Sequence, residues 1–125
     1  QACPLFVPII EEGLQNDLIA HLAIKKYLTN LINNQIELLI LGCTHYPLLK
    51  QSITQNIPQN IKILDSANSI AHYLNHYLIN QQLSSLEKTN NSRIIITDEA
   101  KNFKSLATII LNKKNITLEV LHLTS

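Results

Sequence analysis

The stretch Glu37–Pro47 reads Glu-Leu-Leu-Ile-Leu-Gly-Cys-Thr-His-Tyr-Pro. Its first part, Glu37–Leu41, is a short, continuous apolar run, which is typical of a strand covered on both faces. Gly42–Tyr46 then predicts a loop. Pro47 suits the start of a helix because its ring fixes φ near the helical value. The stretch therefore predicts a buried strand that ends in a loop with reactive side chains.

The residues before this strand predict a loop region and a helix. Cys3–Ile10 is apolar and contains two prolines, so we expect a strand end that runs into a loop. Asp17–Asn33 has apolar residues at helical spacing and predicts a helix that Asn33 and Asn34 end. Its buried side chains should be Leu18, Leu22, Leu28, Leu31 and Ile32, with Lys25 and Lys26 facing outward.

Strands and helices should continue to alternate after Pro47. Leu48–Asn56 predicts a short helix that ends before Pro58. Ile61–Leu64 predicts a strand, and Ala67–Leu83 predicts a longer helix. The buried stripe of that helix should be Ile70, Leu74, Tyr77 and Leu78.

The last part of the chain follows a polar stretch, Ser84–Ser92, which we expect to be a crossover linker. Arg93–Thr97 predicts a strand, Glu99–Leu111 a helix and Thr117–Leu123 a final strand. The whole pattern predicts an α/β fold with a mostly parallel sheet flanked by helices. The expected organisation is an α/β segment over residues 1–83, a linker over 84–92 and a strand–helix–strand segment over 93–125.

Composition excludes several classes of protein. With 46% hydrophobic and 15% charged residues among 125, the chain can form the core of one domain or a large part of one. The net charge of +1 and the lack of a basic cluster argue against a nucleic-acid partner. Apolar runs are too short and too interrupted for a membrane span. The sequence contains no methionine and no signal peptide, so we expect upstream residues to be missing.

Cysteine and glycine usage bears on compartment and cofactors. Cys3 and Cys43 are too few for a disulfide scaffold and suit the reducing cytoplasm. Their spacing relative to His45 does not match a zinc motif, so no metal is expected. Only Gly13 and Gly42 are present, so there is no glycine-rich phosphate loop. This argues against a dinucleotide or nucleoside triphosphate cofactor bound in the usual way, and no lysine stands in a setting that suggests pyridoxal phosphate.

The loop after the first predicted strand has the residues for acid–base chemistry. In open α/β sheets, ligands bind beyond the carboxyl ends of the strands. Cys43 should lie there near a helix N-terminus, which favours the thiolate. His45 can lower the pKa of this thiol or exchange protons with it. Thr44 offers a hydroxyl and an N–H for a substrate carboxylate. The alternative is that Cys43 is a small buried hydrophobe and His45 an ordinary capping or surface residue.

Two acidic positions are candidates for the same site, and each also has a purely structural interpretation. Glu11, with Glu12 beside it, follows an apolar run and can place a carboxylate in the same crevice, or the two can be solvent-facing helix caps. Asp65 ends a predicted strand, where it can line the cleft or cap the next helix. Cys3 is expected to be structural because apolar residues surround it in the sequence.

Two blocks of this sequence resemble the cofactor-independent glutamate racemases of the aspartate/glutamate racemase superfamily. Leu41–Leu49 is similar to the family's second-cysteine signature, and Ala2–Glu11 to a block upstream of it. Ile63–Ala67 and the region from Thr97 to the last strand fit more loosely. The resemblance implies the C-terminal part of a two-domain enzyme with its active site between the domains, in which the final segment returns to the first domain.

The resemblance also implies roles for individual residues. Cys43 would be one of two catalytic thiols, His45 would assist its proton transfer, and Thr44 would bind substrate. Glu11 matches a carboxylate near the active site. The opposing thiol would lie in a missing N-terminal portion, so this chain alone should be inactive.

The implied activity is interconversion of L- and D-glutamate in the cytoplasm, for peptidoglycan synthesis. Exposed sheet edges would make the isolated chain a homo-oligomer. Two alternatives remain. One is a related amino-acid racemase or decarboxylase of the same superfamily, and the other is a non-catalytic remnant or interaction module.

Overall fold

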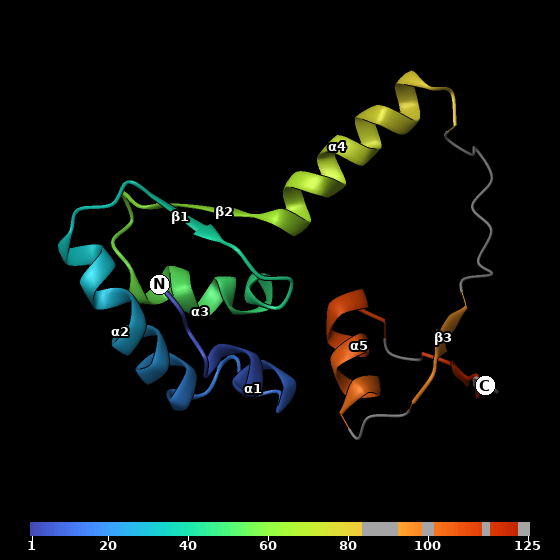
Figure 1. The fold of residues 1–125 in the computed structure, drawn as a ribbon, viewed down its shortest axis with the longest axis horizontal. Helices are drawn as coiled ribbons and strands as arrows, with labels where there is room; N and C mark the ends of the chain where they lie inside the picture. The colour runs from blue at the N-terminus through green and yellow to red at the C-terminus, as the bar shows by residue number, and fades with distance from the viewer. Residues whose placement is uncertain (84–92, 99–101, 114–115, 123–125) are drawn as a thin grey trace. The chain divides into compact units, whose positions relative to one another are not determined.

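The computed structural model describes residues 1–83, 93–98, 102–113 and 116–122. The chain divides into two compact units, residues 1–84 and 85–125 (Figure 1). The first unit contains α1 (Phe6–Glu11), α2 (Leu18–Asn33), β1 (Leu38–Leu41), the 3-10 helix η1 (Tyr46–Leu49), α3 (Lys50–Asn56), β2 (Lys62–Asp65) and α4 (Ser66–Asn80). The second unit contains β3 (Ile94–Ile96), α5 (Phe103–Leu111) and β4 (Leu118–Val120).

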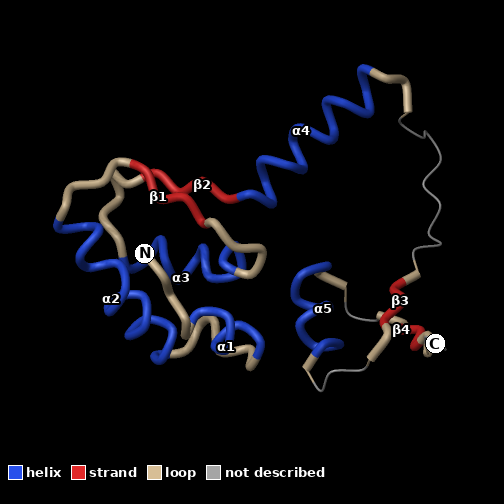
Figure 2. The backbone as a smooth tube through the Cα atoms, viewed as in Figure 1, coloured by secondary structure: helices blue, strands red, loops and turns tan. Residues whose placement is uncertain are grey.

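Both units are built on parallel strand pairs (Figure 2). In the first unit β1 pairs with β2, so that Leu38 lies opposite Lys62 and Leu41 opposite Asp65. In the second, β3 pairs with β4 from Ile94 and Leu118 onward. Parallel strands need a crossover connection, and here helical segments supply it. The predicted α/β class with parallel strands is confirmed.

Several helix boundaries follow from local sequence signals, as predicted. Asp17 caps α2 by accepting a hydrogen bond from the backbone N–H of Ile19 at 3.1 Å. The helix ends at Asn33, with Asn34 as its C-cap. Helix α3 ends at Asn56, before Pro58. The predicted linker, Ser84–Ser92, lies outside the described residues.

The prediction of a strand end over Cys3–Ile10 is wrong, because the chain forms helix α1 there. Pro8 is the third residue of this helix, where a backbone N–H has no intrahelical partner, so the proline costs no hydrogen bond. Phe6, Ile9 and Ile10 are buried. Their spacing of three and four residues is the helical period.

The expectation that the first strand is covered on both faces is also wrong. Leu39 and Leu41 are buried, whereas Leu38 is 47% and Ile40 63% exposed. Helices α1, α2 and α3 lie on one side of the β1–β2 pair (Figure 1), and no other described element of this unit covers the opposite side. This sheet therefore presents an apolar face to solvent.

The predicted buried residues of helices α2 and α4 also differ from those in the structure. In α2, Leu28 is buried as predicted, but Leu18 and Leu22 are exposed, and the other buried residues are Ala20, Ala23 and Ile24. Helix α4 extends away from the end of β2 (Figure 1) and buries no residue. Its predicted core positions, Ile70, Leu74 and Tyr77, are exposed. In α4 the periodicity indicated an apolar face that no described element covers, whereas in α2 the small residues Ala20 and Ala23 place the buried face elsewhere.

The core of the first unit holds the site-bearing elements together. Phe6 is 1% exposed, and its ring packs edge-on against Tyr27 and Tyr46, with centroids 5.5 Å and 5.2 Å apart. Ile53 of α3 and Leu49 of η1 are fully buried. The aromatic contacts join α1, α2 and η1 into one core. Among the described residues, none of the helices has both the length and the apolar character needed to cross a bilayer.

Candidate functional site

The loop that follows β1 places Cys43 at the carboxyl end of a parallel strand. Leu41 is the last strand residue, and η1 begins at Tyr46, so Gly42 to His45 form the connection. Cys43 is a free, partly exposed cysteine. Carboxyl ends of parallel strands are where α/β proteins bind ligands. The predicted site loop thus lies at the expected edge of the sheet.

The structure brings His45, Thr44 and Glu11 together. His45 Nε2 lies 3.6 Å from Glu11 Oε1, and His45 Nδ1 lies 3.3 Å from Thr44 Oγ1. Glu11 is the last residue of α1, so the contact joins that helix to the loop after β1. The side chains of His45 and Glu11 are 36% and 57% exposed. The hydroxyl of Thr44 and the carboxylate of Glu11 thus each lie near one ring nitrogen of His45.

Tyr46 ties the loop to the segment before α1. Its hydroxyl donates a hydrogen bond to the backbone oxygen of Cys3 at 3.3 Å, and its ring packs against Phe6. Burial, together with the nearby Cys3 and Cys43 thiols, raises the pKa of the Tyr46 phenol. The phenol therefore stays neutral and remains a donor. This role of Tyr46 could not be predicted from the sequence, because its partner Cys3 lies 43 residues away in the chain.

Cys3 is buried, as expected for a structural residue. Burial raises the pKa of its thiol above the ordinary value, although the nearby N-terminus partly opposes the shift. A thiol in this state is a poor base. Of the two cysteines, Cys43 is therefore the one suited to proton transfer.

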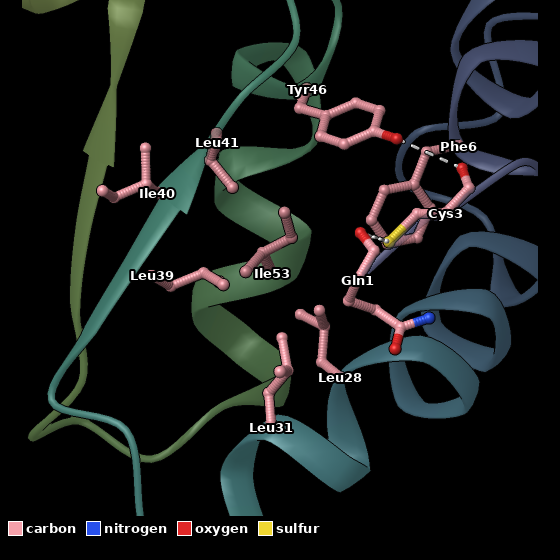
Figure 3. Close-up of a pocket in the computed structure, with 10 residues that line it drawn as sticks. All are labelled: Gln1, Cys3, Phe6, Leu28, Leu31, Leu39, Ile40, Leu41, Tyr46 and Ile53. Carbon is pink, nitrogen blue, oxygen red and sulfur yellow. Dashed lines mark hydrogen bonds between the residues drawn. The ribbon is translucent and has the colours of Figure 1, made fainter.

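A partly open pocket of about 80 Å³ lies between the N-terminal segment, α2, β1 and α3 of the first unit (Figure 3). Apolar side chains from α2, β1 and α3, including Leu28, Leu39 and Ile53, line it together with Cys3 and Tyr46. Cys43, Thr44, His45 and Glu11 are not among its lining residues. The pocket is thus a feature of the core packing and separate from the candidate site.

Buried Asp65, at the end of β2, pairs with the partly exposed Lys50, the first residue of α3. Lys50 Nζ donates to Asp65 Oδ2 at 2.6 Å, and the Asp65 side chain is 1% exposed. Asp65 also caps α4 by accepting from the backbone N–H of Asn68. Of the two roles weighed for Asp65, helix capping is the observed one. Lys50 could not be predicted as the partner of Asp65, because nothing in the residues near Lys50 indicates a buried carboxylate. Among the described residues, no group of three His, Cys, Asp or Glu side chains is placed to hold a metal ion.

Comparison with known proteins points to one enzyme family. No protein-family model matches the chain. It is 41% identical over 122 residues to a glutamate racemase from Persephonella marina, which covers 98% of this chain and 44% of the relative. It is also 41% identical over 111 residues to one from a Sulfurihydrogenibium species, covering 89% of this chain and 40% of the relative. The chain therefore spans less than half the length of these curated relatives.

Solved structures give the same result. The glutamate racemase of Thermus thermophilus, in complex with β-chloro-D-alanine, matches 98% of this chain and 46% of its own with a TM-score of 0.81 at 35% identity. The glutamate racemase of Francisella tularensis, in complex with D-glutamate, matches 95% of this chain and 45% of its own with a TM-score of 0.79 at 34% identity. In sequence and in fold, the chain is therefore homologous to part of the glutamate racemases, of which it matches a little under half.

Proposed function

We propose that this chain is part of a cofactor-independent glutamate racemase and supplies one of its two catalytic thiols. The observation that carries the proposal is the loop after β1, where Cys43 is partly exposed and His45 contacts both Thr44 and Glu11. The homology to glutamate racemases supports the same activity.

The chemistry requires an acid and a base on opposite faces of the substrate. Inversion at Cα needs a base to remove the proton from one face and an acid to return one to the other. In our proposal the Cys43 thiolate removes the proton in one direction, and the Cys43 thiol returns it in the other. His45 exchanges protons with Cys43, and Glu11 orients the imidazole. Thr44 binds the substrate carboxylate through its hydroxyl and N–H.

The second thiol must come from elsewhere. Cys3 is the other cysteine of the chain, and its burial and raised pKa make it unsuitable as a base. We therefore infer that the opposing thiol belongs to a portion of the enzyme outside this sequence. Relatives more than twice as long agree with this inference. The intact enzyme is accordingly this chain together with that portion, and the chain alone does not racemise glutamate.

The substrate and setting follow from the same homology. The Francisella tularensis relative was solved with D-glutamate, which makes glutamate the substrate proposed for the intact enzyme. D-glutamate production would serve peptidoglycan synthesis in the cytoplasm. The apolar sheet face at Leu38 and Ile40 supports the further proposal that the isolated chain associates with a second copy.

Chiral chromatography of amino acids incubated with the intact enzyme tests this function. We expect L-glutamate and D-glutamate each to be converted to an equal mixture, and L-aspartate and L-alanine to stay unchanged. Racemisation of another amino acid in place of glutamate would instead identify a related racemase of the superfamily. No conversion of any amino acid would identify a non-catalytic remnant.

A further inference from the structure

The loop that carries Cys43, Thr44 and His45 is bounded at both ends by elements that meet at one buried residue. Before the loop lies β1, which ends at Leu41. After it, η1 leads into α3, which begins at Lys50. Both boundaries meet Asp65, the last residue of β2.

On the strand side, the contact is the parallel pairing of β1 with β2. Leu41 lies opposite Asp65 in the register, so the two strands end together. The backbone hydrogen bonds between β1 and β2 therefore fix the position at which the loop begins.

On the helix side, the contact is an ion pair. Lys50 Nζ lies 2.6 Å from Asp65 Oδ2, within the range of a charge-assisted hydrogen bond. Lys50 is 39% exposed in its side chain, whereas Asp65 is 1% exposed. Lys50, the first residue of α3, thus links the helix that follows the loop to the end of β2.

Asp65 is itself held rigidly. Its Oδ1 accepts from the backbone N–H of Asn68 at 2.8 Å, and its Oδ2 accepts from Asn68 Nδ2 at 2.9 Å. The Ser69 hydroxyl donates to its backbone oxygen at 2.9 Å. A carboxylate with this many donors has one orientation. It can therefore serve as a fixed anchor for Lys50.

We propose that Asp65, acting through Lys50, is a positioning residue that sets where Cys43 stands at the end of β1. This inference rests on the proposed function for its catalytic meaning. Asp65 itself contacts neither the substrate nor the Cys43 thiol in this account. Positioning of this kind matters because a displacement of about 1 Å at a reacting group can lower a rate by about a hundredfold.

The first test is the kinetics of D65N in the intact enzyme. Asparagine caps helices as well as aspartate does, so this variant keeps the α4 cap and removes the ion pair. We expect kcat to fall between about tenfold and a hundredfold while KM stays nearly unchanged. The matched control is D17N, which makes the same change at the cap of α2 and should keep the wild-type kcat. A wild-type kcat in D65N would overturn the proposal.

A second pair of variants separates positioning from stability. K50M leaves the buried Asp65 carboxylate without its lysine and should lower the melting temperature. Adding D65N to K50M removes that unpaired charge, so we expect the melting temperature to recover. We expect kcat to be low in K50M and not to recover in the double variant, because the link between α3 and the end of β2 is absent in both. Recovery of kcat together with stability would show a merely structural role and overturn the proposal.

The third test needs no racemase activity. Alkylation of Cys43 by iodoacetamide, measured against Cys3 by peptide mass spectrometry, reports the exposure of the loop. In D65N we expect the Cys43 rate to rise roughly threefold because the loop opens more often, while D17N leaves it unchanged. An unchanged Cys43 rate in D65N would contradict the positioning role. If the wild-type intact enzyme does not racemise glutamate, the proposed function fails, and this rate still decides the role of Asp65.

Discussion

His45 Nε2 lies 3.6 Å from Oε1 of Glu11, and this contact joins the loop after β1 to the end of α1. Both side chains are partly exposed, so the contact itself adds only about 0–1 kcal/mol to stability. Its importance lies in orientation. The other imidazole nitrogen of His45 lies 3.3 Å from Thr44 Oγ1, so both ring nitrogens have a partner.

Replacing Glu11 should therefore affect activity more than stability. In the intact enzyme, we expect E11Q to lower kcat by about tenfold or more, because the imidazole loses its charged orienting partner. The free energy of unfolding should change by no more than about 0.5 kcal/mol, as for other surface substitutions. Steady-state kinetics and urea unfolding measure the two effects. E37Q, an exposed glutamate just before β1, is the matched control and should behave as wild type. Equal kcat values for E11Q and E37Q would remove Glu11 from the mechanism.

Acid should destabilise the first unit through Asp65. The hydrogen bond from Lys50, and then those from Asn68, hold the pKa of Asp65 at about 2, below its ordinary value of 3.8. Between these values the unfolded chain binds more protons than the folded one, so stability falls as pH falls. The stability that the ionised Asp65 contributes is complete above pH 3.8 and is lost as the pH falls to about 2.

Urea midpoints for wild type and D65N across this pH range test the assignment. D65N lacks the ionisable group, so we expect it to be less stable than wild type near neutral pH. The difference in stability between wild type and D65N should shrink as the pH falls toward about 2. Two curves that stay parallel throughout the acid range would contradict the assignment of this titration to Asp65.

Phe6 should be the most sensitive core position of the first unit. It is 1% exposed and packs edge-on against Tyr27 and Tyr46. We expect F6A to cost about 3–5 kcal/mol of unfolding free energy, from lost burial and the cavity left behind. L18A is the control, because Leu18 is 69% exposed and should cost little. If F6A lowered the free energy of unfolding no more than L18A does, these aromatic contacts would not be what holds the unit together.

The exposed face of the β1–β2 sheet should drive self-association of the isolated chain. Leu38, Ile40 and Leu64 are 47%, 63% and 45% exposed, and an apolar sheet surface of this kind favours association. We expect light scattering to report a dimer or larger species at high concentration. I40K should shift the chain toward monomer, whereas Q51K, at an exposed polar position of α3, should not. A wild-type monomer with a cooperative melt would contradict this prediction.

The sequence predicted most strands and helices because local signals were strong. The cap at Asp17, the stop at Asn33 and Asn34, and the apolar runs of β1 and β2 each depend on neighbouring residues only. Helix α1 was missed because two prolines suggested extended structure. Pro8, in the first helical turn, is in fact compatible with a helix.

Burial was harder to predict than secondary structure. Periodicity shows which face of a helix is apolar, but it does not show whether anything covers that face. Ile70 and Leu74 of α4 have the spacing of core residues and yet are exposed. For the same reason, the apolar run of β1 predicted a strand covered on both faces, although only one of its faces is covered.

The candidate site was predictable in part. The motif Gly42–Pro47 indicated the loop, and Glu11 came from its place in the similar upstream block. Sequence alone could not pair Glu11 with His45, or Lys50 with Asp65, since these contacts depend on how α1 and α3 pack. Roles for Cys43, Thr44, His45 and Glu11 remain predictions.

Racemisation of L-glutamate by the intact enzyme, compared between wild type, C43S and C3S, tests the central claim most directly. Serine keeps the shape of cysteine but is a far weaker acid, so C43S should lose at least about a hundredfold in kcat in both directions. C3S should retain activity, because Cys3 is a buried structural residue. Wild-type turnover in C43S would contradict the assignment of Cys43 as a catalytic thiol.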